Sequence, residues 1–292
     1  MINRLVAAAL PVTLVTAAII AAWYVAAVSL NSEWAEKQAE RAGTELTWRE
    51  LIAETMSQER PRLAAPHQVM TELWDTVVNK KITSKRSLVF HGRITLSATI
   101  LGFVIGTALG ILLAVGIVHN RAMDLGVMPW AIASQAIPIL ALAPMIIVVL
   151  YSIGLSGLLP KAVISAYLSF FPVVVGMVAG LRSPESMDMD LLDTYAANRW
   201  QIFWKLRLPA SMPFLFASLK VGVAASLVGA IVGELPTGAV AGLGARLLAG
   251  SYYGQTIQIW SALLAAAALA AMLVGLIGLA QKITLSRMGL AG

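Results

Sequence analysis

Six long apolar segments alternate with short polar stretches along this chain. They run over residues 5–30, 94–118, 127–153, 162–181, 214–233 and 257–283. A helix that crosses a bilayer needs about 20 consecutive apolar residues and must satisfy its own backbone hydrogen bonds, because lipid offers none. The pattern therefore predicts an all-α integral membrane protein with six transmembrane helices.

The polar stretches divide the chain into parts with different expected roles. We expect an N-terminal transmembrane helix over 1–30, an outer loop over 31–93, a five-helix core over 94–283 and a cytoplasmic tail over 284–292. A polar loop over 182–212 interrupts the core. The first apolar run exceeds the roughly 7–15 residues of a signal-peptide core, so we interpret it as an uncleaved anchor.

The outer loop carries signals of amphipathic helices. Gly43 would end a charged helix, and Thr47 and Glu50 have the spacing of a capping box at the start of another. Residues 69–78 then place Val, Met, Leu and Trp side chains on one helical face. That face either lies along the outer leaflet or packs against the bundle. The cations Lys80, Lys81, Lys85 and Arg86 that follow are expected to be solvated.

Composition excludes a soluble protein. Hydrophobic residues make up 59% of the 292 residues and charged residues 12%, with a mean hydropathy of +0.80, whereas soluble domains carry about 25% charged residues. The absence of cysteine excludes disulfides and thiolate metal sites.

The net charge of +6 follows from orientation rather than from a nucleic-acid partner. Lys and Arg in short loops mark the cytoplasmic side of a membrane protein. With both termini inside, the short outer loops hold only Lys161 and Arg246. The cytoplasmic side then holds Arg4, Arg121, Arg182, Arg199, Lys205, Arg207, Lys282 and Arg287.

Small and polar residues within the apolar segments suggest how the helices meet. Residues Ala98, Gly102, Gly106, Gly110 and Ala114 recur every four positions. Such a stripe lets two helices approach closely, within one subunit or at a dimer seam.

Prolines predict irregular helices in the third and fourth segments. Pro138, Pro144 and Pro172 each remove a backbone hydrogen bond, and irregular helices in a membrane face protein or a cavity. Candidate lining residues of a translocation pathway are Ser134, Gln135, Ser165 and Ser169. The alternative is that these small polar side chains only bond across helices.

The glycine-rich stretch 234–255 predicts an outer hairpin or re-entrant loop. Glu234 and Arg246 could pair there or contact a docked protein, although solvated loop charges are commoner.

The sequence shows no signal of an active site. It contains no phosphate-binding Gly-x-x-x-x-Gly-Lys-Ser/Thr motif, and His67, His91 and His119 stand far apart and are expected to be solvated or interfacial. We expect no catalytic residue, metal or cofactor. Lys220 is the one ionisable residue expected inside a membrane segment, which argues against an ion-coupled carrier with acidic relays. A transporter of this kind must take its energy from a partner.

The 182–212 loop has the clearest local signals. Ser183 and Pro184 predict a helix start, and Leu191, Leu192 and Tyr195 give that helix an apolar edge. Asn198 can turn the chain before a second helix, which we expect to end at Leu208-Pro209.

The spacing of this loop resembles the signature of permease subunits of bacterial ABC importers. That signature has an acid and two small residues, three variable positions, a glycine, nine further positions, then an aliphatic residue, one variable position and Leu-Pro. Here Asp190 is the acid and Leu206-Arg207-Leu208-Pro209 the end, while Leu191 and Leu192 replace the small residues and Ala196 replaces the glycine. The run from Asn198 to Ala210 is most similar to the nitrate/sulfonate/taurine group.

The resemblance implies a type I ABC importer permease bundle in the bacterial inner membrane, with the 182–212 loop as a coupling helix that docks on separate ATPase subunits. It further implies a periplasmic solute-binding protein, a second permease copy or a similar permease, and a small polar or anionic solute or a vitamin precursor. The coupling residues implied are Asp190, Leu191, Leu192, Ala196, Asn198, Arg199, Trp200, Leu208 and Pro209. From the residues alone, a membrane scaffold or sensor and an ion-coupled carrier stay open.

Overall fold

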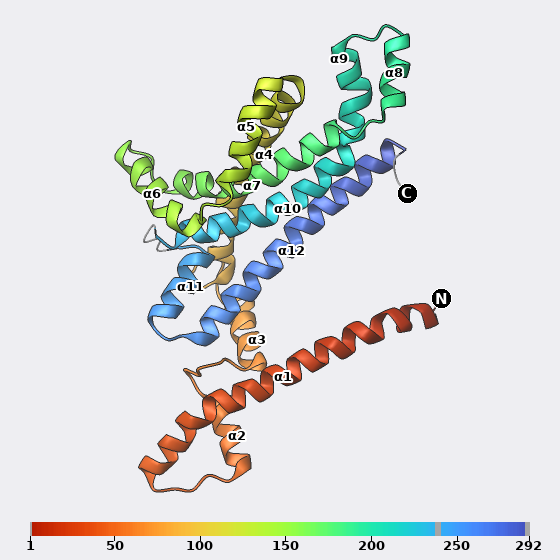
Figure 1. Ribbon diagram of the computed structural model, residues 1–292. Helices are drawn as coiled ribbons and strands as arrows, with labels where there is room; N and C mark the ends of the chain where they lie inside the picture. The colour runs from red at the N-terminus through yellow and green to blue at the C-terminus, as the bar shows by residue number, and fades with distance from the viewer. Residues whose placement is uncertain (1, 237–240, 290–292) are drawn as a thin grey trace. The chain divides into compact units, whose positions relative to one another are not determined.

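The computed structural model describes residues 2–236 and 241–289, with side chains from residue 10 onward, and within these ranges the chain forms helices and no strand (Figure 1). The helices are α1 (Ile2–Ala42), α2 (Trp48–Ser57), α3 (Pro66–Trp74), η1 (Asp75–Asn79), α4 (Leu88–His119), α5 (Arg121–Ser134), α6 (Ile139–Ser152), α7 (Leu158–Leu181), α8 (Ser186–Thr194), α9 (Arg199–Ile202), η2 (Phe203–Arg207), α10 (Leu208–Glu234), α11 (Leu243–Tyr252) and α12 (Thr256–Arg287).

The described helices fit the prediction of six membrane spans: five are long and apolar enough to cross a membrane, and a bent pair of helices brings the number to six if it is one span. Long, apolar helices run over Leu10–Ala42, Leu88–His119, Leu158–Leu181, Arg199–Glu234 and Thr256–Arg287. The bent pair is formed by α5 and α6. By contacts the chain divides into two compact units, residues 1–90 with 246–265, and residues 91–245 with 266–292.

The first helix continues without a break past residue 30, where the first membrane segment was predicted to end, to Ala42. Residues 31–42 contain no Gly or Pro, and Lys37 pairs with Glu33 one turn earlier at 2.7 Å. Gly43 then takes a φ of +66°. The N–H groups of Gly43 and Thr44 bond back to Glu40 and Ala39 at 3.2 and 3.0 Å. This glycine stop confirms the prediction from sequence.

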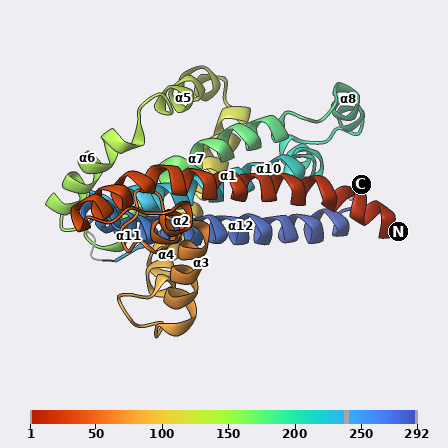
Figure 2. The ribbon, with the colours of Figure 1, turned by 90° about the horizontal axis from the view of Figure 1, so that it is seen from below.

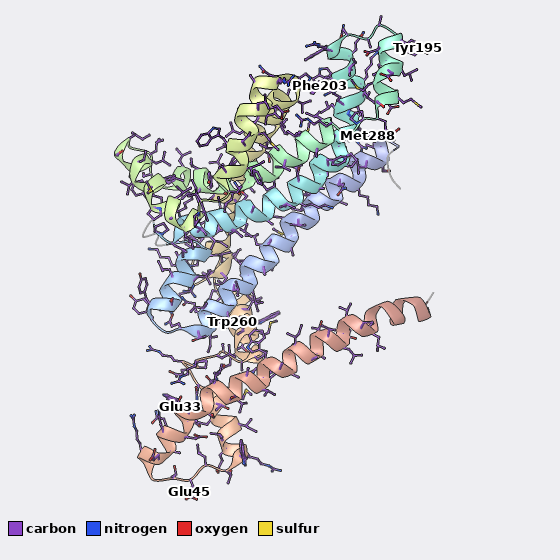
Figure 3. The ribbon with its side chains drawn as sticks, in the orientation of Figure 1. Glu33, Glu45, Tyr195, Phe203, Trp260 and Met288 are labelled. Carbon is purple, nitrogen blue, oxygen red and sulfur yellow. The ribbon has the colours of Figure 1, made fainter. Side chains whose placement is uncertain are left out.

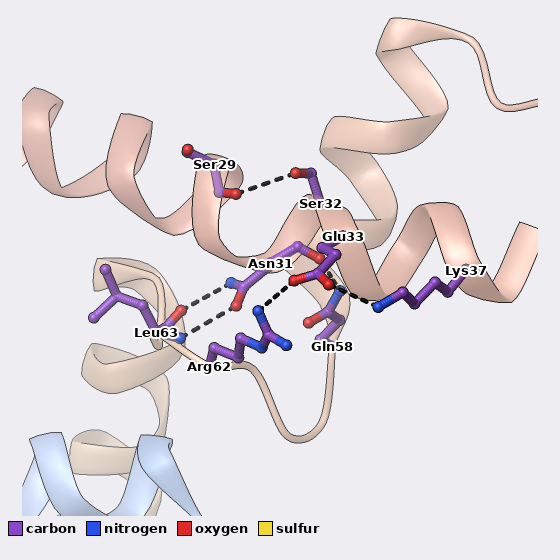
Figure 4. Close-up of polar contacts among 8 residues, drawn as sticks. All are labelled: Ser29, Asn31, Ser32, Glu33, Lys37, Gln58, Arg62 and Leu63. Carbon is purple, nitrogen blue, oxygen red and sulfur yellow. Dashed lines mark hydrogen bonds and ion pairs between the residues drawn. The ribbon is translucent and has the colours of Figure 1, made fainter.

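The rest of the first unit is fastened to α1 by polar contacts. The side chain of Asn31 is fully buried, donates to the Leu63 carbonyl at 2.9 Å and accepts from its N–H at 3.2 Å (Figure 4). Arg62 pairs with Glu33 at 2.6 Å. The Glu50 carboxylate accepts from the Thr47 N–H at 2.9 Å, as the capping spacing predicted.

The predicted apolar face of residues 69–78 is only partly packed. Val69 is fully buried, whereas Met70, Trp74 and Val78 are exposed. Lys80 pairs with Asp75 at 3.0 Å rather than being purely solvated.

The second unit is built around the packing of α4 and α10 on α7. A Cβ added to Gly106 would lie 2.1 Å from the Ser169 hydroxyl, and one added to Gly102 would lie 2.6 Å from the Ala162 carbonyl oxygen. A Cβ on Gly229 would lie 2.7 Å from the Ser165 Cα. The small-residue stripe therefore brings helix backbones of one subunit together.

The third apolar segment is broken rather than continuous. Helices α5 and α6 meet at 103°, and the chain between them covers residues 135–138 (Figure 2). Pro138 precedes α6, where its missing N–H costs no helical hydrogen bond. Pro144 and Pro172 are accommodated inside α6 and α7.

The stretch after α10 forms a helix where a hairpin or re-entrant loop was expected. Residues 243–252 form α11, and residues 237–240 lie outside the described part. The difference from the expected loop applies to residues 234–236 and 241–255, which the structure describes.

Candidate functional site

The first helix of the 182–212 loop begins later than predicted. The Ser183 hydroxyl donates back to the Gly180 carbonyl at 2.8 Å, so it does not cap the next helix. Glu185 holds the N-cap position of α8. Helices α8 and α9 project together beyond the ends of α7 and α10 within the second unit (Figure 1).

The outer face of α8 carries an exposed apolar ridge. Met187, Leu191 and Tyr195 follow one another at four-residue spacing and are 76%, 55% and 77% exposed. Asp190 is exposed and Leu192 is half-buried. Figure 3 shows Tyr195 at the tip of this projection. The apolar edge predicted from sequence is therefore present, with Met187 in place of Leu192.

The turn after α8 is a Schellman motif centred on Ala196. The Ala196 N–H donates to the Asp193 carbonyl at 2.9 Å and the Ala197 N–H to the Leu192 carbonyl at 3.0 Å. Ala196 has a φ of +52°, the one positive φ among described non-glycine residues. The expectation that Asn198 supplies the turn was wrong, because its φ is −76°. Ala196 thus takes the conformation that the glycine of the signature adopts at least cost.

Asn198 instead starts the second helix of the loop. Its side-chain oxygen accepts from the Gln201 N–H at 2.9 Å, and the Gln201 side-chain oxygen accepts from the Asn198 N–H at 2.9 Å. This reciprocal pair satisfies two N–H groups that no helical partner can reach. The capping pair of Asn198 and Gln201 therefore fixes where α9 begins, directly after the Schellman turn.

The expected break at Leu208-Pro209 is also wrong, because the helical path continues from Arg199 to Glu234. The turn over Phe203–Arg207 widens to a π-helix, and the Leu208 N–H bonds to the Phe203 carbonyl. Pro209 follows in the first turn of α10. Because a π-turn shifts the hydrogen-bond register, it accommodates a proline without ending the helix. The loop is therefore continuous with a membrane span.

Aromatic side chains join the base of the loop to α4. The ring of Phe203 lies edge-on to that of His119, with centroids 5.4 Å apart. Ile202 is 8% exposed, whereas Trp200 and Trp204 are 69% and 50% exposed. Ile202 and Phe203 therefore pack within the chain, whereas Trp200 and Trp204 are exposed in the single chain.

Charged groups surround this base. A cavity of about 300 Å³ is lined by side chains that include His119, Asp193, Arg199 and Arg207. Arg182 pairs with Asp124 at 2.9 Å and thereby links the end of α7 to the start of α5. Because the pair is part-exposed, its contribution to stability is small.

The four candidate pathway residues fall into two pairs with different surroundings. The Ser165 hydroxyl is fully buried and lies 2.6 Å from both the carbonyl and the hydroxyl oxygen of Ser226, and Ser169 is fully buried on α7. In this structure these two residues bond across helices, which was the alternative interpretation. Ser134 and Gln135 lie at the break between α5 and α6, where Gln135 is exposed.

A buried polar cluster at the outer end of α10, by the expected orientation, was missed from sequence. Glu234 is fully buried. Its carboxylate accepts from the Thr95 hydroxyl at 2.9 Å and from the Gly244 N–H at 2.7 Å. The Thr95 hydroxyl accepts from the Leu243 N–H at 2.8 Å, and His91 from the Gly242 N–H at 3.0 Å. The cluster fixes residues 242–244 onto α4 and α10.

This cluster corrects three expectations. Glu234 is buried and bonded to Thr95 rather than solvated, and His91 is buried rather than solvated. Lys161 lies inside α7 at 9% exposure, so Lys220 is not the sole internal ionisable residue. The sequence offered one signal of this cluster. Glu234 stands at the end of an apolar run, and the glycines that follow it have no side chain to keep the backbone away from the carboxylate.

No group of three or more metal-ligating side chains occurs in residues 2–236 and 241–289.

Comparisons with known proteins place these features in a family. The model of the family described as binding-protein-dependent transport system inner membrane component matches residues 106–288. The formylaminopyrimidine transport permease protein ThiX of Halalkalibacterium halodurans is 34% identical over 58% of this chain and 66% of its own length. The riboflavin transport system permease protein RibX of Chloroflexus aurantiacus is 32% identical over 66% and 70%. The nitrate import permease protein NrtB of Leptolyngbya laminosa is 23% identical over 73% of each chain.

Proposed function

The chain belongs to the family of inner membrane components of binding-protein-dependent transport systems, and from this membership we propose that it forms the translocation pathway of an ABC importer for a small polar or anionic solute. The ATPase activity resides on separate subunits, because this sequence has no phosphate-binding motif. A solute-binding protein outside the membrane delivers the solute.

The exposed ridge of α8 carries this proposal. Met187, Leu191 and Tyr195 would leave a contiguous apolar face in water, and such faces mark interaction sites. An amphipathic helix that lays its apolar face into a groove is a common mode of recognition. We assign the ridge to a groove of the ATPase subunit.

The connection between α8 and the membrane would transmit the movement of the ATPase. The Schellman turn and the capping pair join α8 to α9 with few free torsions, and α9 continues through η2 into α10. A rigid-body displacement of α8 therefore reaches a membrane span directly. ATP binding biases the permease only so far as the ATPase contacts its inward- and outward-facing states differently.

The remaining coupling residues have supporting roles in this proposal. Ala196 and Asn198 set the angle between the two short helices. Leu208 and Pro209 pass the chain from the π-turn into α10. Asp190, Arg199 and Trp200 are exposed and border the docking face.

The pathway and its orientation belong to the same proposal. Both termini lie in the cytoplasm, as the distribution of Lys and Arg indicates. Ser134 and Gln135, at the 103° break between α5 and α6, line the pathway, whereas Ser165 and Ser169 hold α7 to its neighbours. A second permease copy or a similar permease completes the channel.

Reconstitution tests the function. The chain is co-expressed with its ATPase and binding protein, purified and placed in proteoliposomes that contain ATP. We expect solute uptake that depends on ATP, on the binding protein and on this chain, and that persists when the proton gradient is collapsed. Uptake that follows the proton gradient without an ATPase would contradict the proposal.

A further inference from the structure

Lys220 lies inside the apolar run 214–233 of a membrane-spanning helix. At 1.5 Å per residue it is about 9 Å from the first residue of this run and about 20 Å from the last. The hydrocarbon core of a bilayer is about 30 Å thick. Lysines near the end of a span can extend to the headgroups, whereas the Lys220 Nζ lies beside Gly278 of the neighbouring span.

The ammonium group rests against a neighbouring span. A Cβ added to Gly278 of α12 would lie 3.6 Å from the Lys220 Cε and 3.8 Å from its Nζ. The glycine therefore leaves room beside the half-buried ammonium. Within residues 10–236 and 241–289, Lys220 makes no hydrogen bond or ion pair.

No counter-ion for Lys220 is available from the membrane segments of this sequence. The six apolar segments contain no Asp or Glu, and Glu234 directly follows the fifth of them. The Glu234 carboxylate is already bonded to Thr95 and Gly244. An identical second copy would bring the same segments and hence no further acid.

An ammonium group inside a membrane is costly unless an anion or water compensates its charge. In a pair of identical permeases the membrane segments supply no anion, which leaves the transported solute as a source of one. We propose that Lys220 binds the anionic group of the transported solute while it crosses the membrane. This inference rests on the proposed function and narrows its solute to an anion. The three donors of a lysine suit a small oxyanion such as nitrate or a sulfonate.

Chemical restoration of the charge tests the inference. The chain has no cysteine, so Lys220→Cys introduces a unique thiol. Its thiolate attacks 2-aminoethyl methanethiosulfonate, forms a disulfide to the aminoethyl group and releases methanesulfinate, which restores an ammonium. Methyl methanethiosulfonate reacts in the same way but leaves a neutral methyl group. Val221→Cys, at a 59% exposed neighbouring position, is the control.

Uptake of nitrate and of taurine is then measured in the reconstituted complex with ATPase and binding protein. We expect Lys220→Met and unmodified Lys220→Cys to lose about tenfold or more of the uptake, as removal of a charged contact does. The aminoethyl reagent restores uptake and the methyl reagent does not. ATP hydrolysis stimulated by the binding protein is retained, and Val221→Cys transports normally with or without either reagent.

Three results would overturn the inference. The first is anion uptake by Lys220→Met that equals that of the original chain, and the second is restoration of uptake by the methyl reagent as fully as by the aminoethyl reagent. Either result shows that the charge of Lys220 is not needed for uptake, and neither contradicts the permease function. ATP-dependent uptake of riboflavin but of neither anion by the unmodified chain also contradicts it and leaves the permease function intact. Absence of ATP-dependent uptake of all three solutes by the unmodified chain sinks the proposed function as well.

Discussion

The carboxylate of Glu234 accepts a hydrogen bond of 2.9 Å from the hydroxyl of Thr95, a residue 139 positions earlier in the chain. The same hydroxyl accepts from the Leu243 N–H. Thr95 therefore joins α4, α10 and the segment before α11 through one side chain. Such a fully satisfied buried network favours one arrangement of its elements.

Replacement of Thr95 by Val is expected to destabilise the fold. The two side chains are nearly the same shape, but Val leaves a buried carboxylate with one donor fewer and the Leu243 N–H without its acceptor. The expected cost is about 1–3 kcal/mol, measured as a lower midpoint of thermal unfolding in detergent. Ser97→Ala is the matched control, because the Ser97 hydroxyl is exposed and bonds only to Ile94 in its own helix. An equal midpoint for both variants would show that the cluster contributes nothing.

Close packing of α4 on α7 predicts intolerance at Gly106. The Cβ of a Val there would lie 2.1 Å from the Ser169 hydroxyl and 2.8 Å from the Ala166 carbonyl oxygen. Because one of these atoms belongs to the backbone, the helices must move apart, at a cost of about 1–3 kcal/mol or more. Gly92→Ala on the same helix is the control, because no atom lies within 4 Å of its added Cβ. A Gly106→Val variant that purifies and unfolds like Gly92→Ala would refute the packing.

The positive φ of Ala196 predicts that glycine is better there. Ala196→Gly removes the steric cost of a left-handed residue and is expected to stabilise the turn by several tenths of a kcal/mol up to about 1 kcal/mol. The measurement is slower hydrogen exchange at the N–H groups of residues 196 and 197. Ala197→Gly is the control. Ala197 has no positive φ, so glycine there relieves no steric cost and only makes the backbone more flexible. Faster exchange in Ala196→Gly than in the original chain would contradict the turn geometry.

The sequence predicted the membrane spans and the helix signals at Gly43 and Thr47 better than it predicted the connections between the helices. The apolar segments, the Gly43 stop and the Thr47–Glu50 pair depend on local periodicity and on neighbours within four residues, and the structure confirmed these features. Pro209 was misjudged because a π-turn, which has no sequence signature, carries the helix past it. Ala196 was misjudged because two local hydrogen bonds of the helix C-cap outweigh its intrinsic preference for a negative φ.

At the candidate sites, too, local sequence patterns did not predict contacts between distant parts of the chain. Ser165 and Glu234 have partners 61 and 139 residues away, which no local pattern reveals. Glycines at 242 and 244 were visible, but their role depends on the Glu234 carboxylate, whose atoms would lie 2.2–2.4 Å from a Cβ on Gly242. Burial of a charged residue follows from the packing of distant segments rather than from its own neighbourhood in sequence.

The exposed ridge of α8 can be tested without knowledge of the solute. Leu191→Glu places a charge at the centre of the ridge, and Glu is a good helix former, so α8 itself is preserved. Ser186→Glu is the matched control, because it adds the same charge in the first turn of α8, about 140° around the helix from Leu191. Both variants are co-expressed with the tagged ATPase subunit and pulled down in detergent.

Retention of the permease on the ATPase is the most direct measurement of the coupling claim. The account predicts that the original chain and Ser186→Glu are retained, whereas Leu191→Glu is retained about tenfold less or not at all, because an apolar contact cannot accept an unpaired charge. Undiminished retention of Leu191→Glu, together with normal ATP-dependent transport, would show that the α8 ridge does not dock the ATPase.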